Sequence, residues 1–127
     1  MSDAVGLREV HNTKVSWAIE DHCSRCRKAF SGASSAYALV QADSHRWTSG
    51  EEELKRYKTG AGWELAFCAN CGSTLVGIFD GRVHGVTLGT VNGDPNIEFE
   101  YHIYVGSKAP SDHIGGTAPR HIAELSD

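Results

Sequence analysis

The alternation of apolar and polar residues predicts a protein built mainly from short β-strands. Larger apolar side chains alternate with smaller or polar ones from Val15 to Ile19 and from Trp63 to Phe67. This is the period-2 pattern of a half-buried strand. An apolar run from Leu75 to Phe79 is followed by Asp80-Gly81, a dipeptide typical of hairpin turns. We therefore expect Arg82 to Leu88 to pair back on that run.

Further strands are expected over Tyr37 to Ala42, over Leu54 to Lys58 and in a last long strand from Phe99 to Val105. In the last strand, His102 belongs to the less apolar face. A short helical turn is expected from Ser24 to Phe30, with Ser24 as its N-cap. The expected fold is mainly β, with seven or eight short strands in several coiled antiparallel sheets and little helix.

Length and composition favour one domain over residues 1–127. Fourteen glycines against three prolines indicate many turns. From Gly106 onward the alternation is lost, and residues 107–127 are expected to form an extended C-terminal tail.

Charge and hydrophobicity narrow the class of protein. The net charge of −4 argues against a general nucleic-acid binder, because such proteins usually carry a basic face. No stretch approaches the roughly 18 apolar residues of a membrane span, and Met1 to Val10 lacks the apolar run of a signal peptide. We therefore expect a cytoplasmic, reducing setting and no membrane partner.

The four cysteines form two C-x-x-C pairs, Cys23/Cys26 and Cys68/Cys71. In a reduced compartment such pairs more often bind a metal or react than form disulfides, and thiolates suit zinc. Gly72 follows the second pair, where the turn often requires a positive φ. The 41 residues between Cys26 and Cys68 exceed the spacing of an ordinary zinc ribbon. One shared four-thiolate site and two pairs of ordinary or disulfide-bonded cysteines both remain open.

Cys23 is also a candidate nucleophile. It precedes the expected helical turn and is followed by the basic residues Arg25, Arg27 and Lys28, whose charge would make its sulfur more reactive. The alternative is that these basic residues form an ordinary solvated face.

Two of the seven histidines, His22 and His102, lie where they could matter to a site. If the strand continues, His22 points away from Cys23, and His102 could reach a polar site. Surface or structural roles are expected for the other five, which are His11, His45, His84, His113 and His121.

Several stretches together resemble the glutathione-dependent formaldehyde-activating enzyme family, which includes the centromere protein V type. His22 to Lys28 is similar to its C-H-C-x-x-C-R-[KR] stretch, and Arg46 to Gly50 to its F-R-W-x-S-G segment. Phe67 to Ser73 resembles its F-C-x-x-C-G-S motif, and Val86 to Thr90 its D-V-x-x-G-[ST]-L region. His102 to Pro110 resembles its H-I-[FWY]-V-x-S-K-x-P motif. The resemblance runs in order from about residue 15 to residue 121.

This resemblance implies an Mss4-like fold of coiled β-sheets, also found in methionine sulfoxide reductase B. It implies zinc as the cofactor and glutathione or a related thiol adduct as the partner. In enzymatic members it implies addition of glutathione to formaldehyde to give S-hydroxymethylglutathione, a reaction of the carbon–sulfur lyase type.

The chain departs from the family pattern of seven cysteines. The early C-x-C of the structural zinc site is absent, and Asp21 stands where the first cysteine of the more labile site belongs. The resemblance assigns Cys23 and Cys26 to that labile, catalytic site, and Cys68 and Cys71 to the structural one. Asp21 could supply an oxygen ligand beside Cys23 and Cys26. Two separate sites, one converged site and no metal remain three alternatives.

Two functions follow from these residues. The first is an enzyme, possessing reduced activity or none, that acts on the glutathione–formaldehyde adduct through Cys23 and Cys26. The second is a non-catalytic binding module stapled by zinc. A methionine sulfoxide reductase is excluded because no cysteine follows Cys71. Serine-hydrolase and phosphate-loop motifs do not occur either.

Overall fold

The computed structural model describes residues 8–9, 15–41, 44–45, 47–60, 62–94 and 96–123. Its elements in chain order are β1 (Arg8–Glu9), β2 (Val15–Asp21), α1 (Ser24–Phe30), β3 (Ser35–Val40), β4 (Trp47–Ser49), η2 (Glu51–Glu53), β5 (Leu54–Lys58), β6 (Trp63–Cys68), β7 (Thr74–Phe79), β8 (Arg82–Thr87), η3 (Leu88–Thr90), β9 (Phe99–Ile103) and η4 (Val105–Ser107). The predicted mainly β fold with little helix is confirmed.

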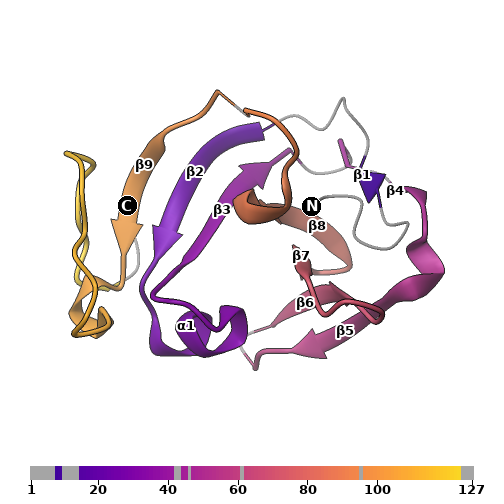
Figure 1. Cartoon of the computed structure of the whole chain (residues 1–127), viewed down its shortest axis with the longest axis horizontal. Coiled ribbons are helices and arrows are strands. Elements are labelled where there is room, and N and C mark those ends of the chain that lie inside the picture. The colour runs from indigo at the N-terminus through magenta and orange to yellow at the C-terminus, as the bar shows by residue number, and fades with distance from the viewer. Residues whose placement is uncertain are drawn as a thin grey trace.

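Seven strands form one sheet in the order β5-β6-β7-β8-β3-β2-β9, and β1 pairs with β4 in a two-stranded sheet. Figure 1 shows the larger sheet curling from β9 through β2 and β3 round to β6 and β5. One pairing differs from the antiparallel expectation, because β9 runs parallel to β2. Strand β9 follows β8 in the chain but lies on the far side of β3 and β2 in the sheet. A long connection between β8 and β9 carries the chain across, so that β9 can pair in parallel with β2.

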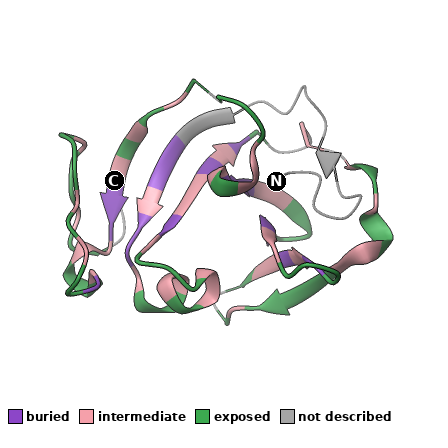
Figure 2. Ribbon diagram, in the orientation of Figure 1, coloured by how far each residue is buried: buried purple, intermediate pink, exposed green. Residues whose placement is uncertain are grey.

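The hairpin predicted around Asp80-Gly81 is confirmed. Asp80 has φ 54° and Gly81 has φ 76°, so both turn residues are left-handed, as the tight hairpin turn that matches strand twist demands. Strands β7 and β8, which this turn joins, contribute residues to the centre of the core. Leu75 and Val76 of β7 are fully buried there and pack in one cluster with Ala38 and Ala66. Figure 2 shows the contrast with edge strand β5, which is almost entirely exposed.

Element boundaries follow the sequence pattern closely, with local corrections. Strand β5 has the predicted bounds. The strand expected from Tyr37 begins earlier, at Ser35, and its expected end at Ala42 lies outside the described residues. Helix α1 forms where predicted, but its N-cap is Cys23 rather than Ser24. Strand β9 ends at Ile103 rather than Val105, because Tyr104 has φ 55° and the chain turns into η4.

The C-terminal segment, residues 117–123, folds back along β9, as the yellow trace beside β9 in Figure 1 shows. The His102 N–H donates to the Pro119 carbonyl at 2.9 Å, and the His121 N–H donates to the His102 carbonyl at 2.8 Å. The segment therefore covers the outer edge of β9 and fixes the backbone of His102. Among the described residues, no helix is long and apolar enough to cross a membrane.

Candidate functional site

The junction between β2 and α1 brings together Asp21, Cys23 and Cys26, which we call the Asp21 cluster. Their candidate ligand atoms all lie within 4.8 Å of one another. The Cys23 backbone N–H donates to Asp21 Oδ1 at 2.9 Å, and the Cys26 thiol donates to Asp21 Oδ2 at 3.3 Å. The carboxylate thus holds both cysteines in place, one through its backbone and one through its side chain.

Burial shapes the electrostatics of the Asp21 cluster. Asp21 is 7% exposed, and desolvation raises its pKa against the opposing effect of its hydrogen bonds to Cys23 and Cys26. Desolvation also raises the pKa of Cys26 to about 12, and the negative charge of Asp21 adds to that shift. Two anionic groups so close together are costly unless a cation compensates them. Two thiols and a carboxylate form a donor set that fits zinc with one coordination position left open.

The second cysteine pair lies at the end of β6. Cys68 is fully buried and Cys71 is exposed. The predicted positive φ of Gly72 is confirmed at +81°, and its N–H donates to the Cys68 carbonyl at 2.7 Å. Cys71 Sγ lies 3.2 Å from Ser73 Oγ, and that hydrogen bond is the main reason the pKa of Cys71 is lowered.

The structure keeps the two cysteine pairs in different surroundings. None of the four cysteines, all of which lie in the described residues, forms a disulfide. Within the described part of the chain, neither group of three candidate ligands within 4.8 Å contains Cys68 or Cys71. The assignment of metal ligands among Cys23, Cys26, Cys68, Cys71 and Asp21 stays a prediction, and so does a catalytic role for Cys23 and Cys26.

The basic residues expected to activate Cys23 are unevenly exposed. Arg25 and Lys28 face solvent, whereas Arg27 is half-buried. Two of the three thus fit the solvated-face alternative.

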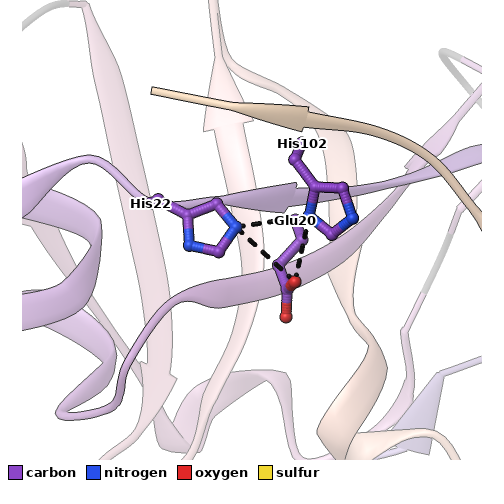
Figure 3. Close-up of side chains that lie close together, drawn as sticks. All are labelled: Glu20, His22 and His102. Atoms are coloured by element: carbon purple, nitrogen blue, oxygen red, sulfur yellow. Dashed lines mark hydrogen bonds and ion pairs between the residues drawn. The ribbon is translucent and has the colours of Figure 1, made fainter. Parts of the chain in front are cut away.

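A second cluster, not assembled by the sequence pattern, consists of Glu20, His22 and His102 (Figure 3). We call it the Glu20 cluster. His22 is fully buried and His102 is 2% exposed. Their ring atoms His22 Nε2 and His102 Nδ1 are 3.3 Å apart. Desolvation is the main cause that lowers the pKa of His102, while the Glu20 carboxylate acts in the opposite direction.

Part of this cluster could be anticipated. Glu20 and His22 are two residues apart, which places them on one side of an extended chain, and His102 does reach a polar site. The missing information was the parallel pairing of β2 and β9, which sets Glu20 opposite His102.

Of the five histidines for which surface or structural roles were expected, His11 lies outside the described residues.

Comparison with known families matches residues 6–107 to the glutathione-dependent formaldehyde-activating enzyme family. Among solved structures, a Rhodobacter sphaeroides protein is similar, with a TM-score of 0.52 and 21% sequence identity over 86% of this chain and 88% of that one. No curated protein matches the chain. The family match spans both cysteine pairs and both clusters up to His102.

Proposed function

Because the chain belongs to the glutathione-dependent formaldehyde-activating enzyme family, we propose that it acts on the glutathione–formaldehyde adduct as an enzyme of the carbon–sulfur lyase type. The Asp21 cluster is the proposed site, with Cys23, Cys26 and Asp21 as zinc ligands. The observation that carries this proposal is the convergence of these three ligand atoms within 4.8 Å. They lie in the stretch that resembles the labile zinc site of the family.

The proposed reaction joins a thiol to an aldehyde. The sulfur of glutathione adds to the carbonyl carbon of formaldehyde, the carbon–sulfur bond forms, and the carbonyl electrons move to oxygen, which takes up the proton that the thiol loses. When bound, zinc would supply a positive charge that stabilises thiolate sulfur. Asp21 orients the site, since its two oxygens engage the Cys23 backbone and the Cys26 thiol.

The test is the exchange rate between free glutathione and its formaldehyde adduct, measured by two-dimensional exchange NMR with zinc-loaded protein. We expect the wild-type protein to accelerate exchange. Cys23→Ser and Cys26→Ser should abolish the acceleration while circular dichroism stays unchanged. Lys55→Ala, on exposed strand β5, is the matched control and should retain it. An unchanged exchange rate with wild-type protein would rule out this activity.

A second candidate function is a non-catalytic binding module whose fold is stabilised by bound zinc. It is favoured by Asp21, a carboxylate where the family pattern has a thiolate, and by the absence of the early C-x-C. The two functions are distinguished by combining metal analysis with the exchange measurement. Bound zinc that raises the melting temperature without any accelerated exchange supports the binding module.

A further inference from the structure

We propose that the Glu20 cluster is a second divalent-metal site, with zinc as the ion that its ligands suit best. Its ligands would be Glu20 Oε1, His22 Nε2 and His102 Nδ1. The proposal rests on the geometry of this cluster and does not depend on the glutathione activity. Two nitrogens and one carboxylate oxygen, with a fourth position open, form one of the ligand sets of catalytic zinc.

The distances among the three atoms match those around one ion. They are 3.1 Å from Glu20 to His102, 3.3 Å between the two histidines and 3.5 Å from Glu20 to His22. Zinc binds histidine nitrogen and carboxylate oxygen at about 2.0–2.2 Å, so two ligands of a tetrahedral ion lie about 3.3–3.6 Å apart. The three atoms therefore form a triangle of the size of one tetrahedral face (Figure 3).

Hydrogen bonds cannot join all three pairs of these atoms at once. Each ring nitrogen carries at most one hydrogen, and a hydrogen bond runs nearly straight between two atoms. If both rings donate to Glu20 Oε1, two N–H groups face each other at 3.3 Å. If only one ring donates, at least one close contact has no proton between its atoms. A cation in the centre attracts all three lone pairs at once.

The surroundings orient these atoms for a metal. His22 Nδ1 is buried without a hydrogen-bond partner, yet lies 3.6 Å from Asp112 Oδ2. A small approach lets Nδ1–H donate to that carboxylate, which leaves the Nε2 lone pair for the ion. Histidine ligands of metals almost always have such a partner. The Ser34 hydroxyl donates to Glu20 Oε2 at 2.9 Å, which leaves Oε1 facing the histidines.

The backbone holds the ligands before any ion arrives. The His22 N–H donates to the Ile103 carbonyl at 2.9 Å, and Glu20 is opposite His102 in the parallel pair. The Glu20 side chain is 24% exposed, so solvent reaches the cluster from that side. The open position can accept water or an oxygen of a small carbonyl or carboxylate compound.

Cadmium-113 NMR of folded, metal-free protein titrated with Cd²⁺ tests this site, because nitrogen and oxygen ligands shift the resonance away from the thiolate region. We expect one resonance from nitrogen and oxygen ligands. Cys23→Ser/Cys26→Ser should keep it, which separates this site from the Asp21 cluster. His113→Gln, an exposed histidine next to Asp112, should also keep it.

His102→Gln and Glu20→Gln should each weaken Cd²⁺ affinity at this resonance at least tenfold. If the His102→Gln variant, changed at a buried residue, does not fold, the test relies on Glu20→Gln. The Glu20 side chain is partly exposed, so this change should disturb folding less. Absence of the resonance in wild-type protein overturns the proposal. So does a resonance that persists at full affinity in folded Glu20→Gln protein, since it would come from surface histidines.

Discussion

At the residue scale, the proposed role of Asp21 as a zinc ligand predicts how its replacement changes zinc affinity. Asp21 is a carboxylate next to two thiols, and thiolate is the softer ligand for zinc. Replacing Asp21 with Cys should therefore tighten zinc binding by about tenfold or more, whereas Asp21→Asn should weaken it. Competition with a chromophoric chelator measures both changes.

The matched control for Asp21→Cys adds a thiol away from the cluster. Ser111→Cys places it on an exposed loop and should leave zinc affinity unchanged. If Asp21→Cys binds zinc no more tightly than wild type, Asp21 is not a ligand.

Cys68 and Cys71 should differ in reactivity although only two residues separate them. Cys71 is exposed, and its hydrogen bond to Ser73 lowers its pKa, whereas Cys68 is fully buried. Since the exposed thiolate is the nucleophile, iodoacetamide should modify Cys71 at least about tenfold faster than Cys68 in metal-free native protein. Peptide mass spectrometry over time measures both rates.

Denatured protein is the control for that experiment, because unfolding should make the two rates similar. Zinc added before the reagent should slow modification of Cys71 if this pair holds an ion. Equal rates in the native protein would contradict the buried position of Cys68.

At the element scale, the turn from Cys68 to Ser73 depends on a left-handed glycine. Gly72 has φ +81°, and nothing lies within 4 Å of an added Cβ. The cost of Gly72→Ala is therefore conformational, about 1 kcal/mol of unfolding free energy. Urea denaturation of metal-free protein measures it. Gly89→Ala, which also has open space but no positive φ, should lose much less stability, and an equal loss would refute the conformational explanation.

The elements that the sequence predicted well are those whose signal is local. Alternation places β2 and β6, and a turn dipeptide places the hairpin of β7 and β8. The Asp21 cluster was also accessible, because its three residues lie within six positions of the chain. The Glu20 cluster was not, because His22 and His102 are 80 residues apart. Only the return of the chain to a parallel position beside β2 brings them together.

At the scale of the whole molecule, one strand supports both clusters. Successive side chains at the end of β2 alternate in direction, so Glu20 and His22 join one cluster while Asp21 and Cys23 join the other. The Asp21 cluster is completed locally by α1. The Glu20 cluster depends on β9, and β9 is fixed in turn by the C-terminal segment.

Deleting residues 117–127 should therefore affect the two clusters differently. The deletion removes five backbone hydrogen bonds between that segment and residues 102–106. At about 0.5–1.5 kcal/mol each, their loss should lower the unfolding free energy by roughly 2.5–7.5 kcal/mol. Hydrogen exchange should accelerate at the His102 and Tyr104 amides and stay slow in β6 and β7. Cd²⁺ binding at the Glu20 cluster should weaken, while zinc binding at the Asp21 cluster persists.

The control keeps the backbone and removes a side chain from the same segment. Ile122 is 79% exposed, so Ile122→Ala should change stability far less than the deletion. If the shortened protein kept full stability and full Cd²⁺ affinity, the C-terminal segment would not be what holds His102. The parallel pairing of β2 with β9 would then suffice to place that histidine, because it sets Glu20 opposite His102 without any contribution from the segment.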